Sequence, residues 1–107
     1  MSSTTTPLPP PAVPPEVEAF ASEQGVTAYL PAVLAMTRRI FPSAPMKVLV
    51  EDDPEIANDR HIVVEVELAN MPAEQMAEAQ WAWCGEIFRH CPPTHVHVFR
   101  LGMVPAP

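Results

Sequence analysis

Apolar positions at helical spacing predict two helices in the first part of the chain. Residues 15–25 and 30–41 carry apolar side chains three and four positions apart, which is typical of helices that bury one face. Pro15 stands at the first helical position and Gly25 is a natural helix end. Pro31 falls in the first turn of the second helix, where its missing N–H costs least.

The spacing then changes to that of strands. Residues 46–51 and 61–68 are rich in β-branched side chains and lie between turn-forming residues, which predicts two strands joined by an acidic loop at 52–60. A third helix begins at Pro72 and is ended by the proline pair at 92–93. Residues 94–104 predict the last strand.

This order of elements predicts an α+β domain. We expect a small three-stranded, mostly antiparallel sheet with two N-terminal helices and one crossover helix in the order α-α-β-β-α-β. A last strand beside the first makes the sheet antiparallel throughout, and one beside the second makes it mixed; the pattern leaves both open. The domain is expected to span 15–104, between a disordered proline-rich tail at 1–14 and a short tail at 105–107.

Alternation along the strands divides the predicted sheet into two faces. One is wholly apolar and is expected to pack on a helix. The other mixes apolar side chains with charged and imidazole groups, and the chain offers no further layer to cover it. A second subunit is therefore expected there. The apolar members of this mixed face are Leu49, Val63, Phe99 and Leu101, and the polar members include Lys47, Glu51, His61, Glu65, Glu67, His95 and His97.

The third helix carries more apolar side chains than one packing stripe needs. One side of it has Met76, Gln80, Trp83 and Ile87, and the other has Ala77, Trp81, Cys84 and Phe88. Trp81 and Trp83 point about 200° apart on a helix, so the two indoles cannot enter the same groove. One tryptophan is expected at the periphery or in an interface, where tryptophan is enriched. We assign Trp81 to the predicted interaction surface.

Composition and charge narrow the class of function. The 107 residues include 13 acidic and 6 basic ones, which gives a formal net charge of −7. Binding of nucleic acid or of an anionic membrane surface needs clustered lysine and arginine, and none is present, so neither partner is expected. The chain has no apolar run of about 20 residues and no export signal at its N-terminus. We expect a cytoplasmic protein whose cysteines, Cys84 and Cys91, are reduced thiols.

The histidines of the predicted strands support an alternative hypothesis about function. His95 and His97 are two apart on the predicted strand and face the same side as His61, while Glu65 supplies a carboxylate from a neighbouring strand. Zinc binds imidazole and carboxylate ligands, although no established zinc spacing is present. The alternative prediction is a small metal-binding protein or metal-dependent enzyme with zinc at these four residues.

The leading expectation is a non-enzymatic protein-interaction or regulatory module. It would act as a homodimer or as the small acidic subunit of a complex, an antitoxin-like role among the options, with no cofactor. Its expected surface is the mixed sheet face, with Leu49, Val63, Phe99 and Leu101, together with Trp81. On this hypothesis, Phe99→Arg gives a soluble monomer.

Overall fold

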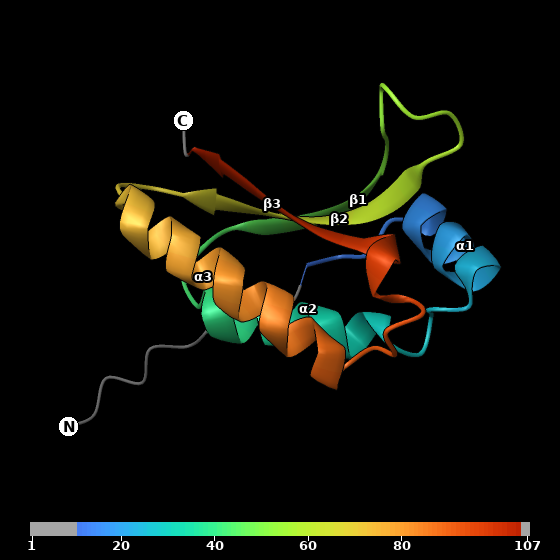
Figure 1. Ribbon diagram of the computed structural model, residues 1–107, viewed down its shortest axis with the longest axis horizontal. Helices are drawn as coiled ribbons and strands as arrows, with labels where there is room; N and C mark the ends of the chain where they lie inside the picture. The colour runs from blue at the N-terminus through green and yellow to red at the C-terminus, as the bar shows by residue number, and fades with distance from the viewer. Residues whose placement is uncertain (1–10, 106–107) are drawn as a thin grey trace.

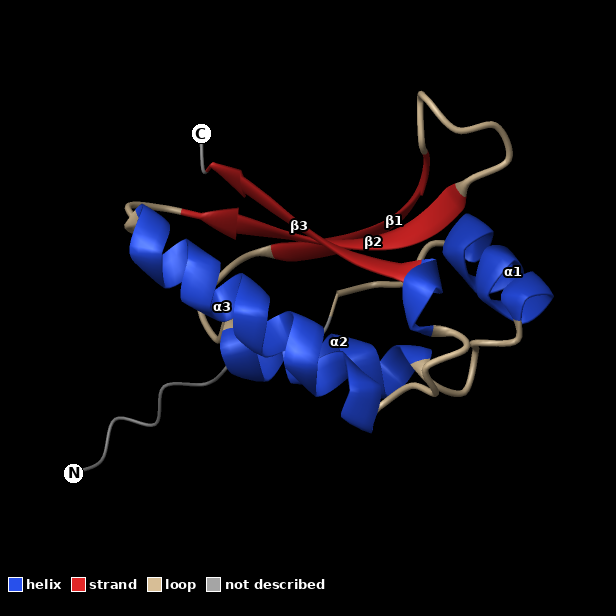
Figure 2. Cartoon of the chain, viewed as in Figure 1, coloured by secondary structure: helices blue, strands red, loops and turns tan. Residues whose placement is uncertain are grey.

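Three helices and a three-stranded sheet make up the part of the chain that the computed structural model describes, residues 11–105 (Figures 1 and 2). The observed order confirms the predicted α+β fold. Within these residues, no helix is long and apolar enough to cross a membrane. The elements are α1 (Pro15–Gln24), α2 (Leu30–Ile40), β1 (Met46–Asp52), β2 (Arg60–Leu68), α3 (Ala73–Glu86) and β3 (Phe99–Pro105), with short 3₁₀ turns at Ile87–Arg89 and Val96–Val98.

Local signals place the ends of the first two helices. Pro15 opens α1, and Gly25 ends it with a left-handed φ of 71°, while the N–H of Val26 donates to the Ala21 carbonyl at 2.9 Å. Pro31 lies in the first turn of α2, as predicted. Residues 1–10 of the predicted tail lie outside the described residues. In the remainder of that tail, Val13 packs against the core.

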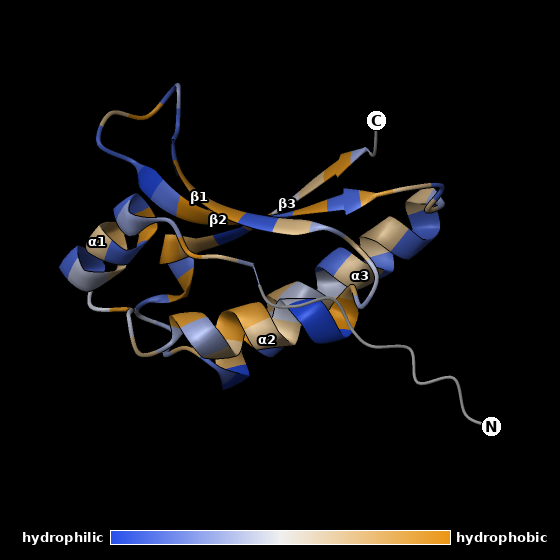
Figure 3. Cartoon of the chain, turned by 180° about the vertical axis from the view of Figure 1, so that it is seen from behind, coloured by the Kyte–Doolittle hydropathy of each residue, from blue (hydrophilic) through white to orange (hydrophobic). Residues whose placement is uncertain are grey.

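The sheet is mixed, with β2 at its centre. β1 pairs antiparallel with β2, and β3 pairs parallel with β2. Of the two strand arrangements that the sequence leaves open, the structure has the one in which the last strand joins the second. β1 and β3 are therefore the two edges. In Figures 1 and 3, α3 lies on the β3 side of the molecule and α2 on the β1 side.

The helices cover one face of the sheet and leave the other face without a helix (Figure 1). The core forms between this covered face and the helices, where Val48, Ile62 and Val64 meet Met36 and Trp83. Hydrophobic residues dominate α2 in Figure 3, as expected of a helix that packs on a sheet. The covered face is apolar, as the sequence predicts.

The last strand corrects part of the sequence analysis. The prediction began it at residue 94, but Val96–Val98 forms a 3₁₀ turn and β3 begins at Phe99. A 3₁₀ turn has three residues per turn instead of the two-residue period of a strand, so the alternation cannot be carried through it. Phe99 pairs with Ile62, and Leu101 with Val64, which places both on the covered face. Their assignment to the mixed face is wrong, and Phe99 is only 4% exposed.

Candidate functional site

The face of the sheet without a helix, here called the outer face, exposes little apolar surface. Val63 is buried and Leu49 is partly buried. Lys47 and Glu65 form an ion pair of 3.2 Å on this face. A Cβ at Gly102 would lie 3.1 Å from Val63 Cγ1, so the valine already fills the space above the glycine. Because Phe99 and Leu101 lie on the covered face, only Leu49 and Val63 of the four predicted interface residues in the sheet lie on the outer face.

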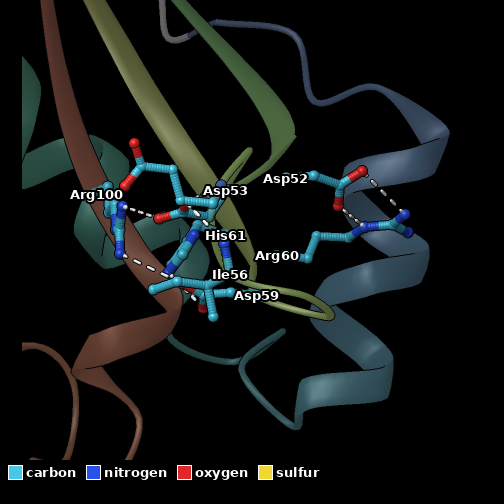
Figure 4. Close-up of polar contacts among 8 residues, drawn as sticks. Asp52, Asp53, Ile56, Asp59, Arg60, His61 and Arg100 are labelled. Carbon is cyan, nitrogen blue, oxygen red and sulfur yellow. Dashed lines mark hydrogen bonds and ion pairs between the residues drawn. The ribbon is translucent and has the colours of Figure 1, made fainter.

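One end of the outer face carries a polar cluster under the β1–β2 loop (Figure 4). His61 is 5% exposed, and its Nε2 lies 3.1 Å from Asp59 Oδ1. Arg100 Nη1 lies 3.9 Å from Asp53 Oδ2, and Arg100 Nη2 lies 3.8 Å from Asp59 Oδ2. The backbone N–H of Asp53 donates to the Asp59 carbonyl at 2.8 Å, which closes the base of the loop. These contacts tie the loop to β2 and β3.

The neighbouring pair Asp52 and Arg60 points away from this cluster (Figure 4). Arg60 Nε donates to Asp52 Oδ1 at 2.7 Å across the hairpin. This hydrogen bond, assisted by the positive charge of Arg60, holds the pKa of the Asp52 carboxyl below its ordinary value. Both side chains are exposed, so the pair fixes the hairpin end and adds little to stability.

The structure does not bring the predicted zinc ligands together. His61 contacts Asp59, whereas Glu65 contacts Lys47. His95 precedes the 3₁₀ turn and its ring centroid lies 6.1 Å from that of Tyr29. His97, in the turn itself, is exposed. Within residues 11–105, no three His, Cys, Asp or Glu side chains gather closely enough to hold a metal ion.

The most exposed large hydrophobic side chain of the described residues lies on α3. Trp83 is 4% exposed and contributes to the core, whereas Trp81 is 83% exposed. Phe88 in the following 3₁₀ turn is 56% exposed. Ala77, Cys84 and Gly85 are also exposed. We call Ala77, Trp81, Cys84, Gly85 and Phe88 the α3 patch.

A hollow of about 530 Å³ lies next to the α3 patch, between α2 and α3. Arg39, from α2, forms an ion pair of 3.3 Å with Glu86, from α3, at this junction. The residues that line the hollow are Arg39, Ile40, Trp81, Ala82, Gly85, Glu86 and Arg89. The sequence analysis assigns no role to Gly85 or to Arg89. The signal for both was their spacing, four and eight residues after Trp81, which puts them on one flank of the helix.

A larger apolar groove, of about 810 Å³, lies between α1 and α2. Leu30, Pro31 and Leu34 of α2 contribute to its wall. Pro11 and Val13 also line it, so the segment that leads into α1 already contacts this groove. The groove is thus partly covered by the chain itself, in contrast to the α3 patch.

Comparison with protein-family models, with curated proteins and with solved structures finds no match to this chain. The functional conclusion therefore rests on the geometry of its surfaces.

Proposed function

We propose that this protein is a non-enzymatic interaction module that binds another protein surface through the α3 patch. The observation that carries the proposal is the 83% exposure of Trp81, beside the half-exposed Phe88. Tryptophan is enriched among residues that dominate binding energy in interfaces. A regulatory or accessory role, such as that of a small acidic subunit, requires a surface of this kind.

The energetics favour coverage of the patch. An aromatic side chain of about 150–250 Å², at roughly 25 cal/mol per Å², gains about 4–6 kcal/mol when it leaves water completely. Trp81 has most of this gain still available, because the fold covers only a small part of its surface. Trp83, two residues away, has already made that gain in the core.

The outer sheet face supports an interaction role less well than the α3 patch. Its apolar residues, Leu49 and Val63, are partly or fully covered by the chain's own side chains. Its polar side chains contact one another, as in the pairs Lys47–Glu65 and His61–Asp59. We therefore propose that the interaction surface is on α3. Of the residues that the sequence analysis assigns to this surface, Trp81 is retained and the strand residues are not.

The experiment compares two exposed hydrophobic residues. Trp81→Glu introduces a charge at the centre of the α3 patch, and Ile56→Glu makes the same change at a 56% exposed residue of the β1–β2 loop. Native mass spectrometry is recorded for the purified chain and for tagged chain isolated from the cells that produce it. We expect an assembly, with itself or with another protein, that Trp81→Glu abolishes and Ile56→Glu leaves intact.

Two results would contradict the proposal. The first is a chain that is monomeric and without a partner in both preparations. The second is an assembly that Trp81→Glu leaves unchanged. Circular dichroism serves as the folding check, and because Trp81 is a surface residue, the variant is expected to keep the spectrum of the unaltered chain.

A further inference from the structure

We propose that the partner of the α3 patch is a second copy of this chain, with the two α3 helices packed antiparallel across a two-fold axis. This inference rests on the proposed function of the patch and identifies what binds there. An interface of this type joins the same surface of both copies, so the surface has to be complementary to itself in shape and charge. The α3 patch meets both requirements.

The sizes of the side chains are complementary when the helix is reversed. Centring the two-fold axis between Trp81 and Cys84 sets each Trp81 opposite Cys84 of the other copy. The same arrangement sets Ala77 opposite Phe88. Each large side chain thus meets a small one, which is the condition for helices to approach within the usual 8–10 Å.

The hollow beside the patch supplies the space for the indole. In the antiparallel arrangement, Trp81 of one copy lies next to Gly85 of the other. A Cβ added at Gly85 would have no heavy atom within 4 Å, so the helix surface is open there. Arg39 and Arg89 line the same hollow of about 530 Å³, and an arginine beside an indole face is a favourable cation–π arrangement.

The charges beside the patch are also complementary to themselves. Glu74 and Glu78 lie in the first half of α3, and Arg89 follows its C-terminal end on the same flank of the helix. Reversal of the second copy sets its Arg89 opposite the two glutamates of the first. None of the ion pairs within residues 11–105 uses these three side chains. Antiparallel helices add a favourable alignment of their dipoles.

The net charge of −7 would favour a basic partner only if the acidic excess lay at the patch. It lies mostly elsewhere. The acidic residues of α1 and of the β1–β2 loop are at the end of the molecule where these two elements meet (Figure 1). Near the patch, glutamates at one end are balanced by arginines at the other. This bipolar pattern fits a reversed copy of itself better than a uniformly basic surface.

A charge exchange tests the arrangement in the purified chain. Sedimentation equilibrium is measured over a range of concentrations for Glu78→Arg, for Arg89→Glu and for the double variant. Each single change is expected to raise the dissociation constant about two- to thirty-fold, because the two-fold axis makes every substitution act at two equivalent surface ion pairs. The double variant restores opposite charges at positions 78 and 89 and leaves Glu74 facing the new glutamate, so it is expected to associate more tightly than either single variant and less tightly than the unaltered chain. Glu55→Arg is the matched control, because it makes the same charge change in the exposed β1–β2 loop.

The outcomes separate this inference from the proposed function. A purified chain that stays monomeric at millimolar concentration overturns the self-association. The proposed function still stands in that case if the chain isolated from cells carries a partner that Trp81→Glu removes. A dimer in which the two charge changes add, without recovery in the double variant, overturns the antiparallel arrangement. A dimer that Trp81→Glu leaves intact overturns both the inference and the choice of patch.

Discussion

Trp81 and Trp83 are separated by one residue on α3, yet Trp81 is exposed and Trp83 is buried. A hydrogen bond satisfies the indole N–H of the buried Trp83. Trp83 Nε1–H donates to Thr37 Oγ1 at 2.8 Å, and the Thr37 hydroxyl donates in turn to the Val33 carbonyl at 2.8 Å. Thr37 is completely buried. The chain of bonds therefore satisfies two polar groups in the core and fixes the position of α3 relative to α2.

This bond predicts the effect of Thr37→Val. The substitution keeps the shape of the side chain and removes the acceptor, so the indole N–H is left unsatisfied in the core. We expect the free energy of unfolding to fall by about 1–3 kcal/mol, measured by urea denaturation. Thr37→Ser, which retains the hydroxyl, should lose less than Thr37→Val. A Thr37→Val variant as stable as the unaltered chain would show that the bond contributes nothing.

Among the elements, β3 is the one whose role changes most between sequence and structure. The sequence places Phe99 in an interface, so that Phe99→Arg would separate two subunits. The register with Ile62 instead places Phe99 in the core. A buried guanidinium in that position has to be desolvated among apolar side chains, which proteins do not tolerate without a partner.

We therefore predict that Phe99→Arg unfolds the chain and that Phe99→Ala lowers the free energy of unfolding by about 3–5 kcal/mol. Leu49→Ala on the outer face is the comparison, and because Leu49 is only partly buried, its loss is expected to be smaller. Thermal unfolding followed by circular dichroism measures all three. A folded, monomeric Phe99→Arg would restore the sequence-based interpretation.

Whether the sequence predicts an element correctly depends on how local its signal in the chain is. The starts of α1 and α2 were predictable because Pro15 and Pro31 act locally, through the backbone of one turn. The two apolar sides of α3 were predictable from helical spacing, which also required one of its tryptophans to lie outside the core. The faces of β3 were not, because the turn at Val96–Val98 shifts the alternation and nothing in the residues before it marks where the strand begins. Contacts between distant segments, such as Arg100 with Asp53 and Asp59, depend on the pairing of β2 with β3, which the sequence left open.

In the whole molecule, the two sides of α3 have different functions. One side closes the core with Trp83 and Ile87, and the other presents the α3 patch to solvent. Both cysteines are free: Cys84 lies on α3, and Cys91 follows the Ile87–Arg89 turn and belongs to the core. Cys84 is exposed within the patch, whereas Cys91 is 3% exposed, and burial raises the pKa of its thiol. Their alkylation therefore reports separately on the patch and on the core.

We predict that the rate at which iodoacetamide modifies Cys84 depends on protein concentration. If nine-tenths of the chains are paired through α3, only about one-tenth expose this thiol at any moment, so the rate falls about tenfold relative to dilute protein. Trp81→Glu should remove the protection at every concentration. Cys91 should react slowly throughout, because only a thiolate reacts and both burial and its raised pKa disfavour one. The extent of modification at each cysteine is read by peptide mass spectrometry. A Cys84 rate that is the same at all concentrations, in a chain that sediments as a dimer, would place the contact between copies elsewhere than on α3.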